Sequence, residues 1–242
     1  MTPQQRDAFF QIHRDLHREG PGEPADVGWA VQQLALSGPV KVLDAACGPG
    51  ADTATLAELL PDARIEGVET VPHFVDEACA RLARFAPRVT VRQGDMRVVQ
   101  GPLDLIWCAG ALYFLGVTEG LRGWRDVLAP GGAIVFSEPV WLDTPPSDAA
   151  MAFWEEYPQI TDLDGIIARV TDAGYQVQDH RMIVGEPWQA YYRPIQDRID
   201  RLRAAAPDAA LKAALDQEQL EIDRWRAAPD DIAYALLIVT PQ

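Results

Sequence analysis

The pattern of hydrophobic and polar positions changes near residue 40. In residues 9–16 and again in 26–36, apolar residues recur at helical spacing, and a turn rich in glycine and proline separates the two stretches. From residue 40 onward, short apolar runs alternate with longer amphipathic stretches. The N-terminal part is therefore predicted to be helical, and the rest to alternate strands with helices.

Five strands are predicted in the alternating region, at residues 40–43, 64–68, 88–92, 103–107 and 133–137. Helical stretches follow the first two of them, at 52–60 and from residue 72 onward. Parallel strands joined by crossover helices form a doubly wound sheet, so the arrangement predicts an α/β fold.

The regularity ends after residue 137. Beyond it the pattern predicts helices at 149–157 and 163–173, a strand at 176–183, a helical insertion at 188–226 and a last strand at 232–240. Pro194 and Pro207 interrupt the insertion, which predicts at least two helices joined by a turn.

The composition is that of a globular protein, with 242 residues of which 48% are hydrophobic and 24% charged. This length supports one core rather than two independent domains. No apolar run reaches the roughly 20 residues that a membrane-spanning helix needs, and the amphipathic start lacks the apolar stretch of a secretory signal. We therefore expect a cytoplasmic protein, either a monomer or a homodimer.

The formal net charge of −15 disfavours some partners. A surface of this sign repels phosphate backbones and anionic lipids, so neither nucleic acid nor a membrane is expected to bind. Cys47, Cys79 and Cys108 are odd in number, widely spaced and without CxxC or His-rich neighbours. Neither a disulfide framework nor a metal site is therefore expected.

A glycine-rich turn follows the first predicted strand. The strand ends in Asp44 and passes through Gly48 and Gly50 into a helix, which surrounds a ligand with backbone N–H groups and a carboxylate. A tight strand-to-helix turn without a ligand gives the same pattern.

Glu69 ends the second predicted strand, 21 residues after Gly48. An acidic side chain at this place can accept hydrogen bonds from both hydroxyls of a ribose. A solvated acid at a strand end is an equal alternative for Glu69 alone, but its pairing with the glycine turn favours a cofactor that contains a nucleoside.

Four motifs occur in order along the chain: Asp44-x-Ala-x-Gly48-x-Gly50, then Glu69, then Gly94-Asp95-Met96 after the third strand, and Leu128-Ala-Pro-Gly-Gly132 before the fifth. Over about residues 38–140 they make the chain resemble the class I S-adenosylmethionine-dependent methyltransferases, with Ala46 where the family usually has glycine. The resemblance implies a Rossmann-like fold with a seven-stranded, mostly parallel sheet and a final antiparallel strand.

The resemblance also implies S-adenosyl-L-methionine as cofactor and a role for each motif. The turn, including Asp44, Ala46, Gly48 and Gly50, would hold the methionyl part, and Glu69 the ribose hydroxyls. Asp95 would accept from the adenine amino group beside the Met96 backbone. Further contacts are expected from Thr70, Cys108 and Ala109.

Three alternatives stay open. A nicotinamide-dependent oxidoreductase also uses a glycine turn and an acid, but its fingerprint requires a glycine where this chain has Thr53. A regulatory protein that binds the cofactor without turnover is a second alternative, because no catalytic base is identified. A methyltransferase acting on a protein is the third.

The acceptor is expected at the carboxyl ends of the fourth and fifth strands, where doubly wound sheets bind ligands. Tyr113, Glu138 and Trp141 lie there and are predicted to face a small-molecule acceptor. Most aromatic residues follow residue 105, which predicts the walls of an apolar pocket. Many of them would serve equally to pack inserted helices on the sheet.

A single methyltransferase domain is thus predicted over residues 1–242. It comprises an N-terminal helical cap at 1–37, a cofactor-binding core at 38–140, and helical insertions at 141–162 and 186–228 that form a substrate lid. His13 and His17 share a helix face, and this spacing without a third ligand favours a surface helix over a metal site.

Overall fold

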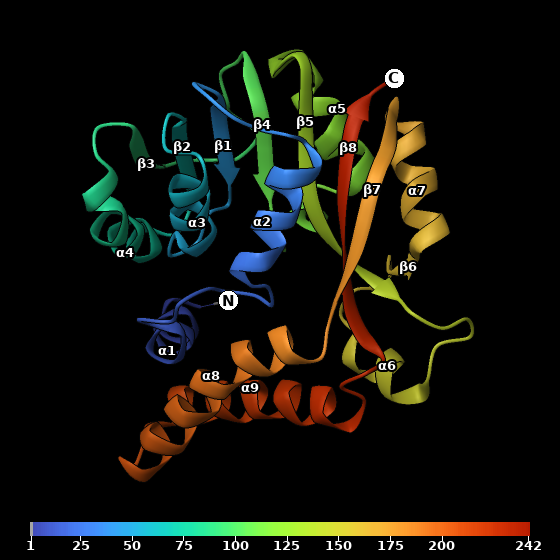
Figure 1. Ribbon diagram of the computed structural model, residues 1–242. Helices are drawn as coiled ribbons and strands as arrows, with labels where there is room; N and C mark the ends of the chain where they lie inside the picture. The colour runs from blue at the N-terminus through green and yellow to red at the C-terminus, as the bar shows by residue number, and fades with distance from the viewer. Residues whose placement is uncertain (1) are drawn as a thin grey trace.

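One sheet runs through the computed structural model, which describes residues 2–242 (Figure 1). Its strand order is β3-β2-β1-β4-β5-β8-β7, and the short β6 pairs with β5 beside this path. The strands are β1 (Lys41–Ala45), β2 (Arg64–Glu69), β3 (Val89–Gln93), β4 (Leu103–Cys108), β5 (Leu128–Trp141), β6 (Thr161–Asp162), β7 (Tyr175–Val184) and β8 (Ile232–Pro241).

The sheet is parallel except at β8, which pairs in antiparallel fashion with both β5 and β7. The predicted doubly wound, mostly parallel sheet with a final antiparallel strand is confirmed. The two-residue β6 is an eighth strand that the sequence did not predict. β5 is longer than expected because residues 134–141 pair with β8 along their whole length.

Helices cover both faces of the sheet. They are α1 (Pro3–His13), α2 (Pro24–Gln33), α3 (Ala51–Leu59), α4 (Pro72–Leu82), α5 (Val117–Trp124), α6 (Asp148–Phe153), α7 (Leu163–Asp172), α8 (Glu186–Ala204) and α9 (Ala209–Ala227), with short 3-10 turns η1 (Ala83–Phe85), η2 (Leu112–Phe114) and η3 (Arg125–Val127). Asp162 and Asp208 start α7 and α9 by accepting backbone N–H groups of the first turn.

Successive side chains of each strand point to opposite faces of the sheet, which divides the core into two parts. In β1, Val42 joins one hydrophobic cluster with residues of α2, α3 and α4, and Leu43 joins the other with residues of α5 and α7. Figure 1 shows α1, α8 and α9 together below the carboxyl ends of the parallel strands. The helical insertion thus covers the edge of the sheet where ligands are expected.

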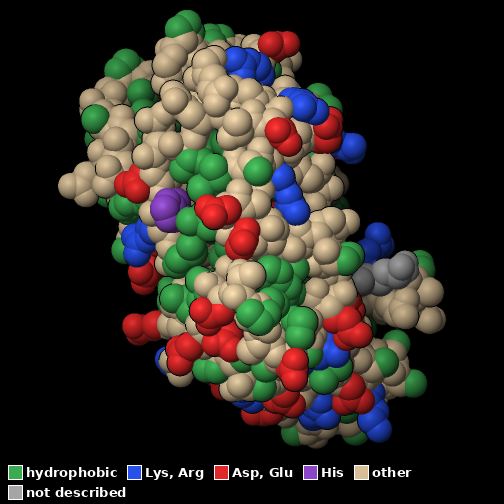
Figure 2. Space-filling view, turned by 90° about the vertical axis from the view of Figure 1, so that its right-hand side faces the viewer, with side chains coloured by type: hydrophobic (Ala, Val, Ile, Leu, Met, Phe, Trp, Pro, Cys, Tyr) green, Lys and Arg blue, Asp and Glu red, His purple; other side chains and the backbone are tan. Residues whose placement is uncertain are grey.

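The insertion consists of two helices, as predicted. Pro194 lies inside α8 without ending it, whereas Pro207 lies in the turn between α8 and α9. The helix predicted at 149–157 is shorter, since α6 ends at Phe153. Figure 2 views the molecule from the side of β7 and α7, and shows many Asp and Glu side chains with Arg among them in its lower half.

Candidate active site

The turn between β1 and α3 has left-handed backbone at Ala46, Gly48 and Gly50, with φ of 59°, 52° and 83°. Glycine adopts this conformation freely, while alanine does so at a cost. A Cβ on Gly50 would lie 3.1 Å from the Cβ of Ala78 on α4, so close packing also requires this glycine. Only Ala46 and Gly48 of the three line the cleft described below.

Glu69, the last residue of β2, holds this turn in place. Its Oε2 accepts the backbone N–H of Gly48 at 3.0 Å. Its Oε1 accepts the Val71 N–H at 2.8 Å and the Thr70 hydroxyl at 3.2 Å. A carboxylate has about four acceptor positions, so the buried Glu69 keeps capacity for a further donor from the cleft.

Asp44 lies buried beneath the same turn. Its Oδ2 accepts the hydroxyl proton of Thr53 at 2.5 Å. Burial, reinforced by the negative charges of Asp52 and Glu69, raises the pKa of Asp44 to about 8. The Asp44 carboxyl therefore holds a proton at neutral pH. Thr53, which occupies the position where a dinucleotide fingerprint requires glycine, has Asp44 as its hydrogen-bond partner.

Asp52 joins three parts of the chain in the first turn of α3. Its carboxylate accepts from Arg18 Nη2 at 2.6 Å and from the Trp107 indole N–H at 3.0 Å. The segment after α1 is thereby tied to the carboxyl end of β4. The Arg18 guanidinium is engaged within the protein by this pair.

Asp95 follows β3 and lies at the surface of the cleft. The Arg97 side chain donates to both of its carboxylate oxygens, with Nε at 3.0 Å from each. These hydrogen bonds lower the pKa of Asp95 to about 2, so it is ionised at neutral pH. Met96 beside it is fixed by its carbonyl, which accepts the Trp124 indole N–H at 2.9 Å.

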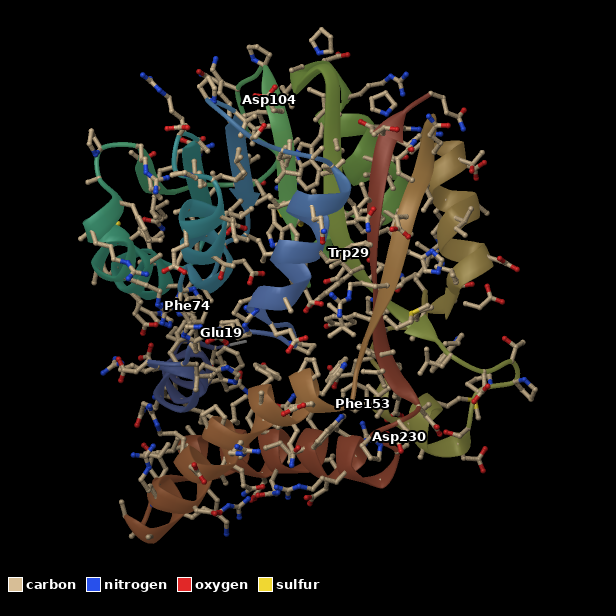
Figure 3. All side chains as sticks on the ribbon, in the orientation of Figure 1. Glu19, Trp29, Phe74, Asp104, Phe153 and Asp230 are labelled. Atoms are coloured by element: carbon tan, nitrogen blue, oxygen red, sulfur yellow. The ribbon has the colours of Figure 1, made fainter. Side chains whose placement is uncertain are left out.

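These groups share one cleft of about 1190 Å³, between the carboxyl ends of the parallel strands and helices α1, α8 and α9. In Figure 3, Glu19 and Phe153, which both line the cleft, lie between the sheet and those helices. The predicted site residues that line it are Asp44, Ala46, Gly48, Glu69, Thr70, Asp95, Met96, Ala109 and Tyr113.

Four predicted site residues do not line the cleft. Gly50 packs against α4, and the Cys108 side chain points into the core on the other face of the sheet. Trp141 stands in register with Ile232 at the end of β5. Glu138 is fully buried, one layer behind the cleft wall.

Glu138 reaches the cleft through a tyrosine. Its Oε1 accepts the hydroxyl of Tyr157 at 2.6 Å, and Tyr157 lines the cleft. Arg169 Nη1 is 4.0 Å from the same oxygen, while Oε2 has no hydrogen-bond partner among the described residues. Burial raises the pKa of Glu138 to about 7.

Aromatic side chains from four separate segments wall the part of the cleft that faces α8 and α9. They are Tyr113, Phe153, Trp154, Tyr157, Trp188, Tyr191, Tyr192 and Tyr234. Trp188 and Tyr192 also belong to the hydrophobic core, so these two side chains both line the cleft and pack α8 on the sheet. The Trp188 ring centroid lies 5.0 Å from that of Tyr234.

His13 is not on a surface face, as the sequence favoured, but is buried against the cleft. Its Nδ1 lies 2.7 Å from a Glu19 oxygen, and its Nε2 lies 3.4 Å from Glu218 on α9. Burial alone would lower the pKa of His13, but the two carboxylates outweigh it and raise the pKa to about 9. A charged imidazolium therefore links α1 to α9.

The sequence did not single out Asp52, Glu218 or Glu221 as cleft residues. Asp52 is the second residue of α3, a position that the motif leaves unspecified. The two glutamates lie three apart and so share a face of α9. The sequence shows this spacing, but it does not show which part of the protein this face of α9 contacts.

Comparison with known proteins agrees with this fold and cleft. Residues 42–132 match the protein-family model described as "Methyltransferase domain". This match supports a class I S-adenosylmethionine-dependent methyltransferase, and the turn, Glu69 and Asp95 lie inside the matched segment.

Among curated relatives, a trans-aconitate 2-methyltransferase of Streptomyces avermitilis is 35% identical over 138 residues, which are 55% of this chain and 50% of that protein. The chain spans about half the length of the curated relatives it matches. Among solved structures, a methyltransferase of Geobacter sulfurreducens in complex with S-adenosyl-L-homocysteine has a TM-score of 0.86 at 22% identity and covers 98% of both chains. One of Thiobacillus denitrificans has a TM-score of 0.85 at 21% identity, with 97% of this chain and 98% of that one covered.

None of the helices in residues 2–242 contains an apolar stretch of the length needed to span a membrane. Within the same range, no group of three or more His, Cys, Asp or Glu side chains is placed to hold a metal ion.

Proposed function

We propose that the protein transfers a methyl group from S-adenosyl-L-methionine to a small-molecule acceptor. The observation that carries this proposal is the pair of carboxylates, Glu69 and Asp95, on one cleft with the Gly48 turn. The cleft suits a ligand that presents hydroxyl and amino groups rather than phosphates, because carboxylates accept from the former and repel the latter.

Glu69, Asp95 and the turn after β1 fit the cofactor's polar groups. Glu69 is held by three donors at the end of β2 and accepts a ribose hydroxyl at its remaining acceptor position, while the ionised Asp95 accepts the adenine amino group. The Asp44–Gly50 turn faces the methionyl part. The methionyl assignment, like those of Thr70 and Ala109, follows from the resemblance and from their place on the cleft.

When bound, S-adenosylmethionine supplies a methyl group on a sulfonium, which an acceptor atom takes by in-line displacement. The protein's part is to align the acceptor and to exclude water, because alignment supplies much of the rate. The aromatic wall and the cover of α1, α8 and α9 serve both purposes. We propose in the same way that residues 141–162 and 186–228 form the substrate lid, and that residues 1–37 form the cap.

The nicotinamide alternative finds no support in the cleft. A dinucleotide fingerprint requires glycine where this chain has Thr53, whose side chain donates a hydrogen bond to Asp44. A cytoplasmic location, a monomeric or dimeric state and the absence of nucleic-acid partners stay predictions.

Labelled methyl transfer tests the proposed function. A cell extract is fractionated by size and incubated with the protein and S-adenosylmethionine that carries a labelled methyl group. We expect the label in the low-molecular-weight fraction, and its loss with Glu69→Ala. Label in protein or nucleic acid would contradict a small-molecule acceptor, and no enzyme-dependent label in any fraction would favour a regulatory protein.

A further inference from the structure

The aromatic part of the cleft contains a carboxylate that the fold's cofactor motifs do not use, Glu221 on α9. Resting on the function proposed above, we infer that the methyl acceptor carries a protonated amino group, which Glu221 and the surrounding tyrosine hydroxyls bind inside the aromatic wall. The acceptor class is thus a cationic amine rather than a carboxylate or a phosphate ester.

Glu221 is held so that it faces the cleft. Its Oε1 accepts the hydroxyl of Tyr192 at 2.8 Å, and Tyr192 is buried at 2% exposure. The Glu221 side chain itself remains accessible from the cleft. A fixed donor on one oxygen leaves the rest of the carboxylate free to accept from a ligand.

Four tyrosine hydroxyls lie within electrostatic range of this carboxylate. Burial is the main cause that raises the pKa of Tyr113, Tyr191, Tyr192 and Tyr234, and the charge of Glu221 adds to it for each of them. All four therefore stay protonated at neutral pH. Their oxygens can accept N–H donors of an ammonium group, which has three to place.

Aromatic ring systems surround the same space. The ring centroid of Tyr234 lies 5.0 Å from that of Trp188 and 5.8 Å from that of Trp154. Trp154 and Trp188 are themselves 6.0 Å apart and nearly perpendicular, so ring faces are presented in more than one direction. The faces of Trp and Tyr attract cations through their quadrupole, and Trp does so most strongly.

In the described part of the chain, no Lys, Arg or His nitrogen lies within 4.0 Å of Glu221; burial raises the pKa of its carboxyl, while the Tyr192 hydrogen bond and the more distant charge of His13 lower it. The cations that line the cleft are engaged elsewhere: Arg18 with Asp52, Arg97 with Asp95, Arg224 with Glu155, and His13 with Glu19 and Glu218. A carboxylate that lines a cleft without a cation in contact with it is stabilised by a ligand that brings one. An anionic acceptor would find no free cation there.

Three probes of one shape and three charges test the inference: benzylammonium, benzyl alcohol and benzoate. Each is titrated calorimetrically into the protein with and without saturating S-adenosylhomocysteine. We expect benzylammonium to bind about tenfold or more tightly than benzyl alcohol, and benzoate to bind weakest, as hydrogen bonds to charged groups and cation–π contacts predict. Equal binding of the three, tighter binding of benzoate, or no measurable binding of benzylammonium at its highest usable concentration would overturn the inference.

The variant Glu221→Gln keeps the shape and removes the charge. It should abolish the preference for benzylammonium while leaving the affinities for benzyl alcohol and S-adenosylhomocysteine unchanged. Glu58→Gln, on the exposed side of α3, is the matched control and should keep the preference. If Glu221→Gln does not fold, Tyr192→Phe removes the one donor that residues 2–242 provide to this carboxylate, so Glu221 is no longer held toward the cleft and the preference should fall severalfold.

The same titrations separate two failures. Absence of S-adenosylhomocysteine binding contradicts the proposed function, whatever the probes do. Normal S-adenosylhomocysteine binding without a preference for the cation contradicts the amine acceptor alone.

Discussion

The backbone N–H of Gly48 donates a hydrogen bond to the carboxylate of Glu69, with 3.0 Å between nitrogen and oxygen. The bond joins the turn after β1 to the end of the neighbouring strand β2. One side chain therefore both shapes the glycine turn and faces the cleft. A loss at Glu69 should affect the conformation of the turn as well as a direct contact to a ligand.

Substitution of Glu69 by Ala should weaken the affinity for S-adenosylhomocysteine by roughly 1–3 kcal/mol, because hydrogen bonds to a charged acceptor are lost. Calorimetric titration measures the change. Glu66→Gln is the control: Glu66 lies on the same strand and pairs with Arg92. Unchanged affinity in Glu69→Ala would reject the assigned role, and an equal loss in the control would point to general damage.

Ala46→Gly should stabilise the protein. Ala46 has φ of 59°, a left-handed conformation that costs alanine about 1–2 kcal/mol, part of which the greater freedom of glycine in the unfolded chain cancels. We expect the free energy of unfolding to rise by about 0.5–1 kcal/mol in urea titration. Ala54→Gly, within helix α3, should instead lower it by about 1 kcal/mol. A loss of stability in Ala46→Gly would show that its methyl group matters more than backbone strain.

Glu138 should make stability fall as pH rises from about 4.5 to 7. Burial raises the pKa of this carboxyl from 4.5 to about 7, so the folded protein binds a proton that the unfolded chain has already released in this range. The contribution is complete below pH 4.5 and is lost as pH rises through about 7, with a size of the order of 3 kcal/mol. Glu138→Gln should flatten this slope in urea unfolding at several pH values, whereas the exposed Glu119→Gln should keep it. An unchanged slope in Glu138→Gln would contradict the shifted pKa.

His13 should affect the pH dependence of stability at higher pH than Glu138 does. Burial opposes its charge, but Glu19 and Glu218 raise its pKa from 6.5 to about 9. The stabilisation is therefore fully present below pH 6.5 and is lost as pH rises through about 9, by an amount of the order of 3 kcal/mol. NMR titration of the imidazole protons measures the pKa directly. An ordinary pKa for His13 would break the proposed link between α1 and α9.

Much of the fold could be predicted because its signals are local. The alternation of strands with helices, the glycine turn and the acids at strand ends each depend on neighbouring residues, and they place Gly48, Glu69 and Asp95 on one cleft. The alternation of side chains along a strand explains why neighbouring residues at the end of β4 differ. Ala109 lines the cleft, whereas Cys108 before it points into the core.

The acceptor side depends on contacts between distant segments. Helix α1 packs on α9, and Arg198 of α8 donates to the Arg14 carbonyl at 2.7 Å, yet these segments are more than 180 residues apart in the chain. An amphipathic pattern predicts a helix but not its docking partner. The burial of His13 and the turning of Glu221 into the cleft therefore could not be predicted from the sequence.

The central claim is that this cleft binds S-adenosylmethionine and its product. Isothermal titration of the 242-residue chain with S-adenosylhomocysteine, and in parallel with NADH, tests it most directly. We predict binding of S-adenosylhomocysteine at one site per chain, weakened in Glu69→Ala, and no binding of NADH. Binding of NADH without binding of S-adenosylhomocysteine would contradict it.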